Sequence, residues 1–160
     1  MERSCRRVVT GHNSVGKAVV LSDDIRQTEP IPTGEAWFSK LWVTDRTPAD
    51  NNGTADGALI PTGLTSPTGS VLRVVDMPPG MRSPMHRTLS VDYGIVLDGQ
   101  VDMELDGGER VQLQRGDVVV QRGTIHAWVN RGDRMARMAF VLIAANPVDV
   151  GDRSLPEESH

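Results

Sequence analysis

The sequence predicts an all-β, single-domain fold, either an antiparallel barrel or a sandwich. Short apolar segments recur at nearly even spacing, with Gly and Pro between them and no helical period. Residues 101–105 alternate apolar and acidic side chains, as in a strand with one buried and one wet face. A chain of 160 residues is long enough for one domain with a core and short for two.

The first half of the chain predicts three strands and a long loop. Residues 6–10 and 18–22 are β-branched runs separated by Gly, Asn and Ser, which favours a hairpin. Residues 36–44 are apolar and aromatic and predict the next strand. Residues 47–68 are rich in Pro, Gly, Asn, Asp and Thr without periodicity, so we expect a long loop that serves as a flap.

The second half predicts a regular series of strands. They are expected at residues 71–75, 93–97, 101–105, 111–113 and 118–120. Residues 106–109 have the composition of a tight hairpin turn. We expect residues 127–129 to pair with residues 136–145 across a turn. The core of the domain is then residues 69–146, followed by a loose tail over residues 147–160.

Composition excludes several classes of protein. The net charge of −4 and the absence of a dense Lys/Arg stripe argue against nucleic-acid binding. Cys5 is the one cysteine, so no internal disulfide is possible. No apolar run approaches membrane-spanning length, and the N-terminus lacks the core of a signal peptide. These observations predict a soluble, cytoplasmic protein that does not act at a membrane.

Two glycine-framed segments, forty residues apart, each carry one histidine. The first segment contains Gly80, His86, Thr88, Asp92 and Gly99, and the second contains Gly116, Asp117, Gly123, His126 and Asn130. This spacing resembles the two motifs of the cupin superfamily. Thr88 stands where that family has a second histidine, Asp92 stands where it has a glutamate, and Gln121 replaces a proline.

The resemblance implies a double-stranded β-helix, also called a jelly-roll barrel, over one cupin domain at residues 1–160. The segment at residues 6–20 is similar to the opening of small single-domain cupins, some of which lie in biosynthetic or catabolic clusters. In many cupins the N-terminal strands add to the sheet of a partner subunit. A homodimer, with the strands of residues 6–44 extending the sheet or the interface, is therefore expected.

The resemblance also implies a metal site, because cupins usually bind metal with three histidines and one glutamate. This chain offers His86, His126 and Asp92, a facial set that suits Fe, Mn, Ni or Zn with open positions. Aspartate has a shorter reach than glutamate, so the sequence allows this site without assuring it. The alternative is a metal-free barrel in which the histidines bond Asp92, Thr88 or Asn130 and move protons themselves.

Three further residues are candidates for substrate binding. Trp128 lies two residues after His126, so on a strand it faces the same way and forms an apolar wall, or it is a core residue. Arg73 lies inside a strand, where it binds a substrate carboxylate or enolate if it faces inward, and is a solvated charge if it faces outward. Thr88 supplies a weak oxygen ligand.

We therefore expect a small-molecule enzyme of the cupin type that acts on an oxygenated organic acid or a natural-product intermediate. With a divalent metal it is a dioxygenase, decarboxylase, lyase or isomerase whose catalytic residues are His86, His126 and Asp92. Without metal it is an acid/base isomerase or cyclase. The alternative from another class is a non-catalytic protein that binds a small ligand.

Overall fold

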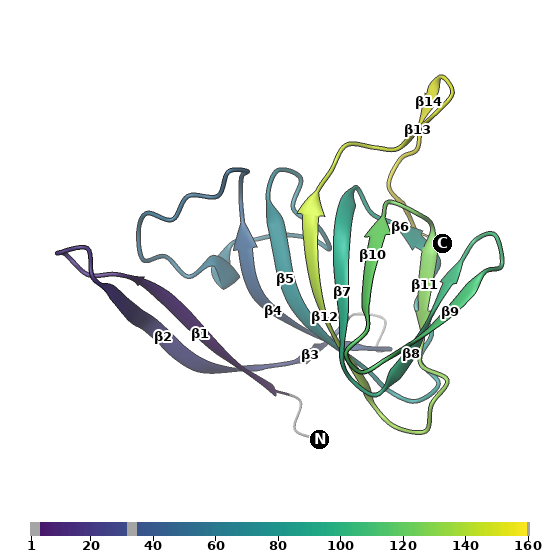
Figure 1. The fold of residues 1–160 in the computed structure, drawn as a ribbon, viewed down its shortest axis with the longest axis horizontal. Coiled ribbons are helices and arrows are strands. Elements are labelled where there is room, and N and C mark those ends of the chain that lie inside the picture. The colour runs from purple at the N-terminus through teal and green to yellow at the C-terminus, as the bar shows by residue number, and fades with distance from the viewer. Residues whose placement is uncertain (1–3, 32–34, 160) are drawn as a thin grey trace.

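A computed structural model of the protein describes residues 4–31 and 35–159 and consists almost entirely of strands (Figure 1). The elements are β1 (Ser4–His12), β2 (Ala18–Gln27), β3 (Glu29–Pro30), β4 (Trp37–Thr44), the 3-10 turn η1 (Gly57–Leu59), β5 (Ser70–Met77), β6 (His86–Arg87), β7 (Ser90–Asp98), β8 (Gln100–Leu105), β9 (Arg110–Gln114), β10 (Val118–Arg122), β11 (His126–Val129), β12 (Ala136–Ala144), β13 (Asp149–Val150), β14 (Arg153–Ser154) and β15 (Glu158–Ser159). Within these described ranges, no helix is long and apolar enough to cross a membrane.

Two antiparallel sheets form the barrel. One has six strands in the order β10-β7-β12-β5-β4-β3, and the other has five in the order β15-β6-β11-β8-β9. Strands that are neighbours in a sheet are often distant in the sequence, as where β12 lies between β5 and β7. This topology confirms the all-β jelly-roll fold expected from the sequence.

The core lies between the two sheets and follows from side-chain alternation. Every second residue of β12 is buried, from Ala136 through Met138 and Phe140 to Leu142. On the adjacent strand β7 the buried face carries Gly94, where a Cβ would lie 2.8 Å from Val119 and 3.1 Å from Phe140. The missing side chain lets interior side chains of β10 and β12 approach the backbone of β7 at this point.

The N-terminal hairpin of β1 and β2 projects from the barrel as a separate two-stranded sheet (Figure 1). Its buried anchor is Arg7, which makes an ion pair with Asp24 in the hairpin and another with Asp56 beside η1. The same guanidinium donates to the carbonyl of Leu41 in β4 at 3.0 Å. The hairpin is therefore attached to the barrel mainly by charged groups.

Two expectations need correction. Residues 127–129 do not pair with residues 136–145, because β11 pairs with β6 and β8 in the other sheet. Asn130 makes this crossing possible, since its side-chain amide donates to the carbonyls of Met77 and Arg134, each at 2.8 Å, and holds the connection between the sheets.

The C-terminal tail is also more ordered than the sequence suggests. It forms the small hairpin of β13 and β14, and then β15 pairs with β6. Arg87 on β6 is buried and makes an ion pair with Glu158 at 3.2 Å. The tail thus closes the edge of the five-stranded sheet beside His86. A two-residue strand at an open edge leaves little sequence signal, because it has almost no alternation to detect.

Candidate active site

The two motif histidines lie side by side inside the barrel. His86 of β6 and His126 of β11 are direct cross-strand partners, and their ring centroids are 4.3 Å apart. Nδ1 of His86 is 2.9 Å from the carbonyl oxygen of Pro84, and Nδ1 of His126 is 3.0 Å from that of Thr124. A carbonyl can only accept, so each Nδ1 carries the proton and each Nε2 presents a lone pair. Within the described residues neither Nε2 has a hydrogen-bond partner.

Asp92 approaches from the opposite sheet. It lies on the buried face of β7 and accepts hydrogen bonds from Ser90 Oγ at 2.5 Å and from Thr88 Oγ1 at 3.2 Å. Burial raises the pKa of the Asp92 carboxyl, and the hydroxyls, His86 and Arg73 oppose that rise.

His126 is a neutral imidazole at physiological pH. Only 2% of its surface is exposed, and burial followed by repulsion from His86 lowers its pKa to about 4. The bond to the Thr124 carbonyl opposes this shift only in part. His126 therefore offers a proton acceptor at Nε2 inside a largely apolar interior.

Trp128 forms an apolar wall next to the histidines, as the sequence predicts, and it is also part of the core. Its ring meets that of His126 edge-on at a centroid distance of 5.5 Å. On its other side it meets Phe140 at 5.2 Å, also edge-on. The two histidines thus lie next to a row of aromatic side chains formed by Trp128 and Phe140.

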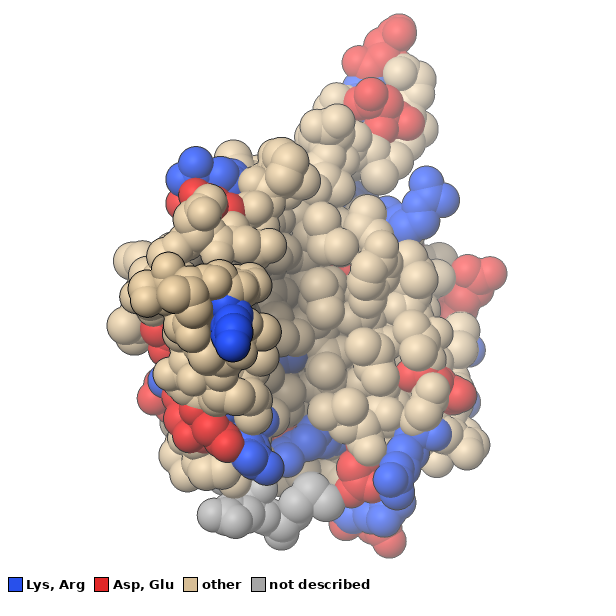
Figure 2. Space-filling view, turned by 60° about the vertical axis from the view of Figure 1, so that its left-hand side comes forward, with Lys and Arg blue, Asp and Glu red and all other residues tan. Residues whose placement is uncertain are grey.

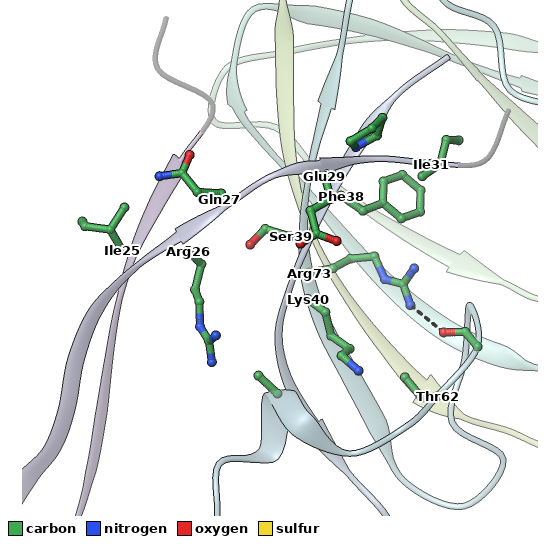
Figure 3. Close-up of a pocket in the computed structure, with 13 residues that line it drawn as sticks. Ile25, Arg26, Gln27, Glu29, Ile31, Phe38, Ser39, Lys40, Thr62 and Arg73 are labelled. Carbon is green, nitrogen blue, oxygen red and sulfur yellow. Dashed lines mark hydrogen bonds between the residues drawn. The ribbon is translucent and has the colours of Figure 1, made fainter. Parts of the chain in front are cut away.

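Arg73 faces inward on β5, on the same side as the core residues Val71 and Val75. Burial lowers its pKa to about 10, with Asp92 opposing the shift, so the guanidinium stays charged at neutral pH. A cleft of about 500 Å³ adjoins Arg73 between β4 and the segment that contains Thr62 (Figure 3). The cleft is not lined by His86, His126 or Asp92, so Arg73 is the candidate residue that links it to the interior.

Comparisons with known proteins agree with this geometry. The family model of the cupin domain matches residues 73–143, which include both histidines. A phomopsin biosynthesis cluster protein, C', of Diaporthe leptostromiformis is 40% identical over 96% of this chain and 85% of its own length. The cupin-domain-containing oxidoreductase fogC of Aspergillus ruber is 38% identical, over 93% of this chain and 77% of its own. The chain belongs to the cupin superfamily.

A solved bacterial protein is similar in fold. The solved polyketide cyclase RemF of Streptomyces resistomycificus superposes with a TM-score of 0.55, at 19% identity, over 84% of this chain and 79% of its own. At that identity the solved structure supports the shared fold alone.

The residues of this cupin do not assemble the three-ligand metal set. Among the described residues, no three His, Cys, Asp or Glu side chains are grouped closely enough to hold a metal ion. His86 and His126 meet, whereas the Asp92 oxygens accept bonds from Ser90 and Thr88.

Three residues of the cupin's interior are absent from the sequence-based site. Ser90 precedes Asp92 by two positions, and strand alternation could have identified it. Gln121 pairs with Asp92 across β10 and β7, and its buried Oε1 has no hydrogen-bond partner among the described residues. Lys40 lines the cleft beside Arg73, and only the pairing of β4 with β5 reveals it.

Proposed function

We propose that this cupin is a small-molecule biosynthetic enzyme that abstracts or moves a proton on an oxygenated organic acid or natural-product intermediate. The observation that carries the proposal is the histidine pair, with both Nδ1 atoms tied to carbonyls and both Nε2 atoms free to accept. Relatives named for phomopsin biosynthesis and as cupin-domain oxidoreductases support the biosynthetic class.

The interior residues have different roles in the proposed proton transfer. Nε2 of neutral His126 accepts a proton from a carbon next to a substrate carbonyl, and His86 lies beside it as a second carrier. The enolate that forms is attracted by the guanidinium of Arg73. Return of the proton to another atom completes an isomerisation, attack of the enolate carbon on a second carbonyl completes a cyclisation, and departure of a β-hydroxyl with the proton, as water, completes a dehydration. In a decarboxylation the loss of CO₂ itself forms the enolate, which then takes up a proton.

A metal-dependent oxidoreductase is the second candidate, and one observation favours it. Metal-binding histidines usually donate their other ring N–H to a carbonyl or carboxylate, as both histidines do here. In that case His86 and His126 would bind Fe, Mn, Ni or Zn, which supplies Lewis acidity or activates O₂. Asp92 would have to exchange its hydroxyl partners for the metal.

Solvent exchange tests the proton-transfer proposal without knowledge of the product. The protein is incubated in D₂O with a panel of enolisable keto acids and aromatic ketones, and deuterium incorporation is followed by NMR. We expect the wild type to catalyse exchange on some members and His126→Ala to lose it, because the acceptor is gone. His12→Ala, which changes an exposed histidine of the hairpin, is the matched control.

Metal analysis separates the two candidates. Protein purified without chelators is assayed for bound metal, in the wild type and in His86→Ala and His126→Ala. Stoichiometric metal that both substitutions remove favours the oxidoreductase. Exchange by metal-free protein supports the acid/base enzyme, and ligand binding without exchange or turnover in any metal identifies a non-catalytic binding protein.

A further inference from the structure

Arg73 shares the cleft with a second cationic side chain, that of Lys40. Lys40 of β4 and Arg73 of β5 are direct cross-strand partners, and both line the cleft (Figure 3). Like charges directly opposite each other destabilise a sheet. The strand register also shifts immediately after Lys40, and such bulges often re-aim side chains near functional sites. Packing alone gives no reason to place these two cations together.

Within the part of the chain that the structure describes, neither Lys40 nor Arg73 has a counter-ion in contact. Lys40 Nζ donates to the carbonyl of Ile60 at 2.8 Å, and Arg73 donates to the carbonyls of Gly63 and Leu64. Among the described residues neither makes an ion pair, and the buried Nε of Arg73, whose residue is only 6% exposed, has no hydrogen-bond partner. A buried charge that bonds only neutral carbonyls is incompletely compensated.

The other side chains of the cleft do not supply the missing charge. Glu29 is the one acid among the described lining residues, and it is exposed and makes no ion pair. Arg26 is already paired with Asp24 and Asp56. In Figure 2 the lobe that contains the N-terminal hairpin is separated from the barrel by a hollow with basic atoms in it. The local field therefore favours an anion.

One part of the cleft wall is apolar and is formed by Phe38 and Ile31. The ring of Phe38 lies under the guanidinium of Arg73, 5.4 Å from its carbon, and Ile31 lines the cleft beside it. A flat apolar body fits against such a wall, with its acidic group toward the two cations. The occupant then combines a planar hydrocarbon portion with an oxyanion.

We infer that Lys40 and Arg73 form a binding site for the carboxylate of a planar organic acid, in the cleft between β4 and residues 60–64. The carboxylate replaces the carbonyl oxygens of Ile60, Gly63 and Leu64, because a full negative charge attracts the two cations more strongly than a neutral carbonyl does. As a substrate subsite this inference rests on the proposed function, in which the guanidinium of Arg73 attracts the enolate. As a binding site it stands alone.

Calorimetric titration with benzoate and with benzamide tests the site. Benzamide has the same shape without the charge. We expect the wild type to bind benzoate saturably and to bind benzamide at least tenfold more weakly. Lys40→Met should bind benzoate about tenfold more weakly than the wild type does. Lys17→Met, which removes the chain's other lysine in the exposed hairpin turn, should bind benzoate like the wild type.

A second measurement keeps the test independent of folding defects. Lys17 and Lys40 are the two lysines of the chain, so mass spectrometry can follow the acetylation of each one separately. Benzoate should protect Lys40 and leave Lys17 unchanged in the wild type and in His126→Ala. Equal affinity for benzoate and benzamide, no saturable benzoate binding, or no protection of Lys40 would overturn the site. The proposed catalysis is judged separately, by deuterium exchange.

Discussion

At the scale of single residues, the candidate site depends on where each polar atom finds its partner. Asp92 is buried, and the hydrogen bonds from Ser90 and Thr88 oppose the rise in its carboxyl pKa that burial causes. His126 is buried next to another imidazole and is kept neutral. The interior therefore holds an acid with a raised pKa, Asp92, and a base with a lowered pKa, His126. Sites that move protons at neutral pH often contain such a pair.

The buried His126 predicts how stability depends on pH. Its pKa is about 4 in the folded protein, below its ordinary value of 6.5, so the unfolded chain binds the proton more tightly. The free energy of unfolding should therefore fall as pH drops from about 6.5 towards 4. At pH 5 the loss attributable to His126 is about 2 kcal/mol relative to pH 7.

Urea unfolding at pH 7 and pH 5 measures this effect. His126→Gln should lose about that much less stability than the wild type over the same interval, whereas His12→Gln should behave like the wild type. Asp92 acts in the opposite direction, since its raised pKa makes the folded state bind its proton more tightly, and comparing variants at the same pH cancels its contribution. Equal pH dependence in wild type and His126→Gln would contradict the assignment.

At the scale of elements, the strands that carry the site are positioned by close backbone approaches. Gly69 precedes β5, and its carbonyl accepts from the amide of Ala144 at 2.8 Å. A Cβ at Gly69 would collide with the backbone carbonyl of Thr44, which cannot move aside as a flexible side chain can. Gly69 therefore limits how closely β4, β5 and β12 can approach one another. Two of these strands carry the cations of the cleft, Lys40 on β4 and Arg73 on β5.

Gly69→Ala should reduce the free energy of unfolding by about 1–3 kcal/mol or more, because overpacking forces backbone shifts. Chemical unfolding measures the change. Gly107→Ala is the control, since no atom lies within 4 Å of its new Cβ and its φ is not in the left-handed region. Equal stability of Gly69→Ala and the wild type would contradict this prediction, because it would show that β4 and β5 can move apart at no cost to admit the new methyl group.

The N-terminal hairpin should detach when its buried anchor is removed. Arg7→Met takes away both ion pairs and the bond to Leu41, while the barrel's own hydrogen bonds remain. Hydrogen exchange should accelerate across β1 and β2 and stay slow in β7 and β12. Arg6→Met, which removes only an exposed pair with Asp23, should leave the hairpin protected. Equal acceleration in β7 and β12 would show instead that the hairpin and barrel open together.

At the scale of the whole molecule, the outer face of the six-stranded sheet is unusually apolar. Val120, Tyr93, Val141 and Leu72 are in register across four adjacent strands, and Val120 and Tyr93 are 56% and 41% exposed. Figure 2 shows a largely uncharged surface beside the N-terminal lobe. Monomers rarely expose large contiguous apolar patches, so this face suits the homodimer that the sequence predicts.

The dimer remains a prediction that light scattering after size-exclusion chromatography can check. We expect twice the chain mass for the wild type and a shift to monomer in Val120→Lys, because a charge would be buried at the interface. Val111→Lys, at an exposed valine of the five-stranded sheet, is the matched control. A monomeric wild type would end this proposal, and a dimeric Val120→Lys would place the interface elsewhere.

Local patterns in the chain predict the class of the fold, most strand positions and the two histidines, because side-chain alternation and glycine turns are local properties. Three features become visible only in the folded molecule: β11 and β12 belong to different sheets, the tail closes a sheet edge, and Lys40 lies opposite Arg73. Strand pairing is non-local, since it depends on how two whole faces pack. Neighbours far apart in the sequence therefore leave no periodic signal in it.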